Sequence, residues 1–96
     1  MPYYFVVEIE KINDRQKYSQ YLDESRPIIE RFGGKTHINT AEIDYLGGSW
    51  KPEKIIVIEF ETLDRLKDCF GSPEYISLIP IRDEAVTGRA VAVKGI

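Results

Sequence analysis

The feature that most constrains this sequence is the run from Lys54 to Glu61, which follows a turn rich in glycine, serine and proline between Gly47 and Glu53. The run is rich in isoleucine, valine and phenylalanine, so it predicts a β-strand. Side chains alternate along a strand, and the apolar ones therefore fall on both faces, with Ile55 and Val57 on one face and Ile56, Ile58 and Phe60 on the other. A strand that is apolar on both faces is typical of the centre of a sheet that is covered on both sides.

The segments before this run predict a strand, a helix and a second strand. Residues 3–10 are rich in aromatic and β-branched residues and predict the first strand. Apolar side chains then recur at three- and four-residue spacing, which predicts a helix that Asn13 caps and Gly33 ends. Pro27 is expected to kink or divide this helix, because proline lacks a backbone donor. Residues 35–46 predict an extended segment with a bulge or turn at residues 39–41.

The segments after the central run predict short helices and a last strand. Thr62 is a helix cap, and Ser72 with Pro73 begins a further helix that Pro80 interrupts. Gly88 is expected to close the helical region, and residues 89–94 form the last strand.

The predicted order is strand, helix, strand, strand, helix, strand. With antiparallel pairing, this order is the ferredoxin-like βαββαβ plait, an α+β fold in which helices cover one face of a four-stranded sheet. The whole chain, residues 1–96, forms one domain. The uncovered face would carry four largely apolar side chains (Tyr4, Val6, Ile55 and Val57), so we expect a homodimer in which two sheets pack face to face.

Composition excludes several classes of protein. The net charge is −3, and the 13 lysine and arginine residues are scattered, which argues against a nucleic-acid partner. No apolar run approaches the length that spans a bilayer, and no signal peptide is recognised, so no membrane partner is expected. The single cysteine, Cys69, fits a reducing cytoplasm. No metal-ligand spacing and no phosphate-binding glycine pattern is present, so no metal or other cofactor is expected.

Glu59 and His37 are the candidate catalytic residues. Glu59 interrupts an apolar strand on the face expected to meet the second copy, where an unpaired carboxylate would be costly. Its carboxylate either pairs with an arginine or with tyrosine hydroxyls, or it acts as a general base or orients a ligand. His37 is the only histidine and is either an exposed surface residue or, if it points into a cleft, the proton acceptor.

Four further residues are candidate ligand contacts. Trp50 lies on a glycine-flanked loop, where an aromatic side chain packs on its own sheet, contacts the second copy or covers a ligand. Tyr75 and Arg82 share a helical face, and Arg82 either binds a carboxylate of the ligand or pairs with an acidic residue. Tyr4 shares the face of Glu59. Tyr18 and Tyr21 lie at helical spacing and are interpreted as core residues.

Several short motifs in the same order resemble one bacterial family. They are Gly33-Gly34-Lys35, Gly48-Ser49-Trp50-Lys51-Pro52, Ile58-Glu59-Phe60, Ser72-Pro73-Glu74-Tyr75 and Pro80-Ile81-Arg82. Together they resemble the family called domain of unknown function 1330, and the likeness covers essentially the whole chain. The resemblance implies the dimeric α/β-barrel group of ferredoxin-like folds, whose members include cofactor-free monooxygenases, haem enzymes and stress-response domains.

Two functions from different classes follow as hypotheses. In the first, a small cytoplasmic dimer binds a small organic molecule between sheet and helices, with cofactor-free oxygenation or isomerisation as the reaction. In the second, the protein is a non-enzymatic binding or stress-associated module without a catalytic site. A cavity of about 300 Å³ or more that reaches Glu59 and His37 would favour the first. Whether the protein is an enzyme stays open at this point.

Overall fold

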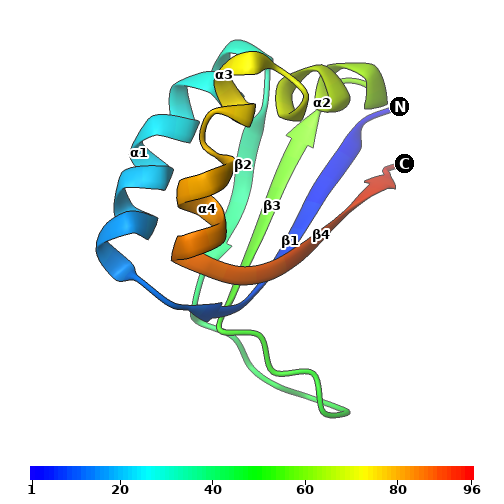
Figure 1. The fold of residues 1–96 in the computed structure, drawn as a ribbon. Coiled ribbons are helices and arrows are strands. Elements are labelled where there is room, and N and C mark those ends of the chain that lie inside the picture. Colours follow the sequence, from blue (N-terminus) through cyan, green and yellow to red (C-terminus); the bar gives the residue numbers. More distant parts are fainter.

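A computed structural model describes residues 1–96. Its elements, in chain order, are β1 (Tyr3–Ile12), α1 (Arg15–Arg31), β2 (Lys35–Thr40), β3 (Lys54–Phe60), α2 (Leu63–Phe70), α3 (Pro73–Ile76), α4 (Ile79–Ala85) and β4 (Val86–Lys94). The strands form one antiparallel sheet in the order β2-β3-β1-β4, and the helices lie on one side of it (Figure 1). The predicted α+β ferredoxin-like plait is therefore confirmed.

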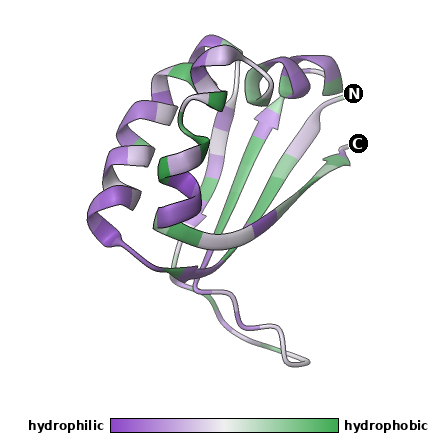
Figure 2. Cartoon of the chain, in the orientation of Figure 1, coloured by the Kyte–Doolittle hydropathy of each residue, from purple (hydrophilic) through white to green (hydrophobic).

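The register of the central strands defines two faces of the sheet. In the pairing of β1 with β3, Tyr4 lies opposite Glu59 and Val6 lies opposite Val57. These residues face away from the helices, whereas Ile56, Ile58 and Phe60 of β3 are buried beneath them. The apolar strands and the polar outer surfaces of the helices are visible in Figure 2. The prediction that β3 is a central strand is correct, because β1 and β2 pair with its two edges.

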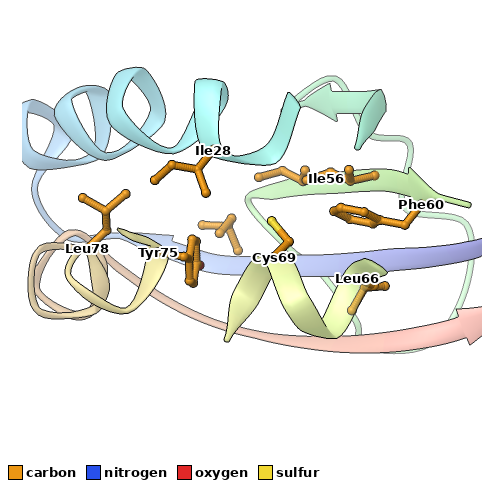
Figure 3. Close-up of a cluster of buried hydrophobic side chains, with 9 residues drawn as sticks. Ile28, Ile56, Phe60, Leu66, Cys69, Tyr75 and Leu78 are labelled. Atoms are coloured by element: carbon orange, nitrogen blue, oxygen red, sulfur yellow. The ribbon is translucent and has the colours of Figure 1, made fainter. Parts of the chain in front are cut away.

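The hydrophobic core fills the space between the helices and part of the sheet. Phe60 and Cys69 are completely buried there, and Tyr75 of α3 points into the same cluster (Figure 3). The ring of Phe70 stacks on Phe5 and meets Tyr75 edge-on. Such aromatic pairs favour close packing at this end of the sheet.

The helix caps agree with the sequence in two cases and differ in one. The side chains of Thr62 and Ser72 cap α2 and α3 as predicted. Helix α1, however, is capped by Asp14, whose carboxylate accepts a hydrogen bond from the amide of Lys17 at 3.0 Å. The amide group of Asn13 is used elsewhere, since it donates to Thr87 of β4 at 3.0 Å.

Pro27 neither ends nor divides α1, which is one helix from Arg15 to Arg31. Pro27 is exposed, so the backbone carbonyl that it leaves without a helical partner is on the solvent side and can be hydrated. The predicted division at this residue is therefore wrong.

Two irregular positions of the sheet also differ from the prediction. The register of β2 against β3 shifts between Thr36 and Ile38, which places a bulge at His37, ahead of residues 39–41, where a bulge or turn was predicted; there β2 ends at Thr40 and the chain bends at Ala41. Gly88 lies within β4 and does not end a helix. A β-carbon on Gly88 would come within 2.5 Å of the backbone oxygen of Glu8, so glycine is needed there for the close approach of β1 and β4.

A long loop joins β2 to β3 and projects beyond the end of the sheet (Figure 1). Leu46 near its tip is 94% exposed and Trp50 is 58% exposed. The loop therefore carries two large apolar side chains that remain mostly exposed. None of the helices has the length and apolar character needed to cross a membrane.

Candidate functional site

A cavity of about 660 Å³ lies between the sheet and helices α1 and α4. Its floor is the apolar inner face of β1 and β3, formed by Phe5, Val7, Ile9, Ile56 and Ile58. Its roof carries polar side chains of the helices, among them Tyr18, Tyr21 and Arg82. The volume is within the range of sites that hold small organic molecules.

The cavity is open because β4 presents small residues to it. Gly88 and Ala90 line the cavity and lie opposite Ile9 and Val7 of β1. The side chains of Arg89 and Val91, which alternate with them along β4, point to the other face of the sheet. The helices rest on the large side chains of β1 and β3, so the space above Gly88 and Ala90 stays unfilled.

Three polar groups from three helices meet at the roof of the cavity. The hydroxyls of Tyr21 in α1 and Tyr75 in α3 are 2.7 Å apart and share a hydrogen bond. The guanidinium of Arg82 in α4 donates to the Tyr75 oxygen at 3.3 Å and pairs with Asp83 at 3.2 Å. One of the two hydroxyl hydrogens lies in the bond between the tyrosines, so the other remains free to donate.

Tyr18 adds a hydroxyl with no partner. Its side chain lines the cavity, the residue is only 6% exposed, and its oxygen makes no hydrogen bond within the protein. The ammonium group of Lys54 lies 4.7 Å from the centre of its ring. A buried hydroxyl without a partner is costly, which makes Tyr18 unusual among the core residues of this chain.

The surroundings keep these tyrosines protonated. Burial raises the pKa of Tyr18 to about 12. Burial also raises the pKa of Tyr21, and the neighbouring Tyr75 and, more weakly, Tyr18 raise it further. Burial acts to lower the pKa of Arg82, but its hydrogen bonds to Tyr75 and Asp83 outweigh that effect and raise it. The site is therefore a set of neutral hydroxyl donors beside a permanent positive charge.

The structure separates the predicted site residues into two groups. Tyr75 and Arg82 lie together at the cavity, with the hydrogen bond described above. Glu59, His37 and Tyr4 lie on the opposite face of the sheet and do not line the cavity. Arg82 does not pair with Glu59.

On that opposite face, His37 and Glu59 form a close pair. Nε2 of His37 lies 2.6 Å from Oε1 of Glu59, and His37 lies at the bulge of β2, on the same side of the sheet as Glu59. Tyr4 is the cross-strand neighbour of Glu59, and its ring centre is 6.4 Å from that of His37. The three candidates from the sequence are thus adjacent, at a surface and not in a cleft.

Trp50 binds a second polar cluster on the same outer face. Its indole donates to Glu8 at 2.6 Å, and Arg89 donates to the other carboxylate oxygen of Glu8 at 2.6 Å. The bond from Arg89, with a weaker one from Trp50, lowers the pKa of Glu8. A shallow polar hollow of about 360 Å³ lies beside them, and Glu59 does not line it. Trp50 therefore anchors the projecting loop to its own sheet.

No group of three or more His, Cys, Asp or Glu side chains is arranged to hold a metal ion. Cys69 is completely buried, and burial raises its pKa to about 11. A buried thiol of this kind is unreactive.

Sequence reasoning missed Tyr18 and Tyr21, because aromatic residues at helical spacing most often belong to a core. The signal that could have found them is on β4, where glycine and alanine alternate with larger residues between Gly88 and Val93. A helix that packs over such a strand leaves space above it, and the polar ends of its tyrosines then face that space.

The strand order, the helices on one face and this intervening cavity define a protein of the ferredoxin-like α+β class. Within that class, the chain belongs to the family described as Domain of unknown function (DUF1330), whose model matches residues 2–96. No curated protein sequence matches it.

Solved structures show the same fold at low sequence identity. A protein of unknown function from Rhodopseudomonas palustris is 18% identical, with a TM-score of 0.82 over 99% of this chain and 82% of that one. A dimeric ferredoxin-like protein of unknown function from Jannaschia sp. CCS1 is 10% identical, with a TM-score of 0.78 over 99% and 100% of the two chains. SnoaB, a cofactor-independent oxygenase from Streptomyces nogalater, is 6% identical, with a TM-score of 0.68 over 99% and 93%.

Proposed function

We propose that this protein binds a small organic molecule in the cavity between the sheet and helices α1 and α4. The observation that carries the proposal is the hydroxyl pair of Tyr21 and Tyr75, backed by Arg82, over an apolar floor. A cavity of this size with a few convergent polar groups is the usual form of a ligand site. The second hydroxyl hydrogen of Tyr21 and Tyr75 has no acceptor within the protein.

A cavity-filling variant tests this proposal. Ala90→Leu places a larger side chain in the cavity, whereas Ala92→Leu lies on the same face of β4 and does not line it. Ligand-observed NMR with a library of small aromatic acids, ketones and phenols should give binders of the native protein. We expect Ala90→Leu to abolish their binding and Ala92→Leu to retain it. Binders that are unaffected by Ala90→Leu, or no binders at all, would contradict the proposal.

We also propose that the outer face of the sheet forms a homodimer, sheet to sheet. Val91 is 58% exposed, and Val93, Ile38 and the partly buried Val6 and Val57 lie beside it on the same face. Monomeric proteins rarely leave such a continuous apolar patch in water. The dimeric ferredoxin-like protein from Jannaschia, which shares the fold, supports this assembly.

The dimer is tested by mass in solution. Light scattering at micromolar concentration should give twice the chain mass for the native protein. Val91→Lys should give the monomer mass, because it places a charge within the apolar patch, while Gln20→Lys on the exposed surface of α1 should leave the dimer intact. A native protein of monomer mass would refute the sheet-to-sheet assembly.

One observation favours proton transfer as a second function. The pair of His37 with Glu59 leaves one ring nitrogen of the histidine without a partner, and a histidine oriented by a carboxylate is a common general base. We propose that the pair moves protons where the second sheet closes over it, in a cofactor-free isomerisation or oxygenation. SnoaB, which shares only the fold, is a cofactor-independent oxygenase. The alternative is a non-enzymatic module in which the pair only ties the dimer together.

The two roles of His37 and Glu59 predict different results for Glu59→Gln. If the pair is structural, this variant weakens the dimer, and the affinity of the cavity for its ligand falls only in parallel with that loss. If the pair moves protons, the dimer persists, and any turnover of a substrate held between the two sheets is lost. If Glu59→Gln retains native dimerisation and native turnover, the pair of Glu59 and His37 neither stabilises the dimer nor transfers protons.

A further inference from the structure

The roof of the cavity offers more hydrogen-bond donors than the protein itself uses. Tyr18 has an unpartnered hydroxyl, and the pair of Tyr21 and Tyr75 has one free hydrogen. The third residue of that cluster, Arg82, supplies only donors. Tyr18 and Tyr21 lie three residues apart in α1 and both line the cavity, so these donors border the same space.

Charge around these donors favours an anion. Arg82 lies behind Tyr75, and Lys54, which makes no ion pair, lies over the ring of Tyr18. Two carboxylates line the cavity, those of Glu30 and Asp83, but both belong to exposed residues, and Asp83 is already paired with Arg82. No carboxylate bonds to any of the three hydroxyls.

We infer that the ligand of this cavity carries a negatively charged oxygen, as in a carboxylate, phenolate or enolate, and that Tyr18 donates to it directly. This inference rests on the proposed function, because it assigns the chemical class of the molecule that the cavity binds. The apolar floor takes the body of the ligand, and its charged oxygen points to the roof. Hydrogen bonds to a charged acceptor are stronger than those to a neutral one, which offsets the cost of removing the anion from water.

Removal of the Tyr18 hydroxyl should change ligand affinity without lowering the stability of the fold. This hydroxyl holds nothing in place within the protein, so Tyr18→Phe should leave the stability in urea unchanged or slightly higher. A residue with a purely structural role would change stability and not affinity. Tyr18→Phe should do the reverse.

The test compares three probes of one shape by isothermal titration calorimetry near neutral pH. They are 2-naphthoate, 2-naphthamide and 2-naphthylmethylammonium, which carry a negative charge, no charge and a positive charge. We expect the native protein to bind 2-naphthoate at least about tenfold more tightly than the other two probes. Tyr18→Phe should lower the affinity for 2-naphthoate by about tenfold and leave the urea midpoint unchanged.

Two kinds of failure are distinguishable with Ala90→Leu. In the first case, the probes bind and Ala90→Leu weakens the binding of all three, but the ammonium binds as tightly as the naphthoate or Tyr18→Phe has no effect. The cavity is then a ligand site, and the inferred anionic class is wrong. If no probe binds the native protein, or Ala90→Leu changes none of the affinities, the proposed function is wrong as well.

Discussion

The buried hydroxyl of Tyr18 should make the fold sensitive to alkaline pH. Its pKa is raised from 10.0 to about 12 by burial, so the unfolded chain loses this proton first as the pH rises. For a group whose pKa is raised by folding, stability is intact below the unfolded pKa and falls as the pH rises toward the folded one. The sensitive window for Tyr18 therefore extends from pH 10 to about 12.

The size of the effect follows from the pKa difference. One pKa unit corresponds to about 1.4 kcal/mol, so near pH 11, midway through the window, Tyr18 lowers the free energy of unfolding by about 1.4 kcal/mol. Phenylalanine at this position has no proton to lose, and the missing hydroxyl costs little near neutral pH because it has no partner. The stability of Tyr18→Phe relative to the native protein should thus increase by about 1.4 kcal/mol between about pH 8 and pH 11.

Urea denaturation followed by circular dichroism at the two pH values measures this difference. Tyr21 and Cys69 also have raised pKa values, but they are present in both proteins, so the comparison isolates Tyr18. Equal pH dependence of the two proteins would refute the reasoning. It would mean that the hydroxyl is hydrated or hydrogen-bonded, and that the cavity lacks the free donor assigned to it.

Changes at the close approach of β4 to β1 and at two helix caps test how the fold positions the cavity. Gly88→Ala should destabilise the protein by about 1–3 kcal/mol, because the new β-carbon would meet the backbone of β1; Gly47→Ala, with nothing within 4 Å, should be neutral in the same urea titration. Ser72→Ala removes a buried cap and should cost about 1–2 kcal/mol. Thr62→Ala removes an exposed cap and should cost about 1 kcal/mol or less in thermal unfolding.

The arrangement of strands and helices was predictable because its signals are local. The double-sided apolar pattern at residues 54–60 identifies the central strand whatever packs against it, and Thr62 and Ser72 mark helix starts by the chemistry of their side chains. The errors arose where tertiary contacts determine the local structure. Asn13 is a good cap by type, but its neighbour Asp14 holds that position because Asn13 reaches across to Thr87.

The candidate site was predicted only in part, for a geometric reason. Tyr75 and Arg82 were predicted to lie on one helical face; they lie on two separate helices, α3 and α4, which nevertheless bring them together. The contribution of Tyr18 and Tyr21 depends on an empty space above β4, which no property of α1 reveals. The contact of His37 with Glu59 likewise depends on the register of β2 against β3.

The strand β4 contributes both to the proposed ligand cavity and to the proposed dimer interface. Its inward positions Gly88 and Ala90 keep the cavity open, and its outward positions Val91 and Val93 supply the apolar surface proposed to meet the second copy. β4 is also an edge strand of this sheet, paired only with β1. A second sheet packed on Val91 would restrain β4 and so the part of the cavity that Gly88 and Ala90 line. Ligand affinity should therefore depend on the assembly, and Val91→Lys, although it is remote from the cavity, should weaken 2-naphthoate binding in parallel with its loss of the dimer.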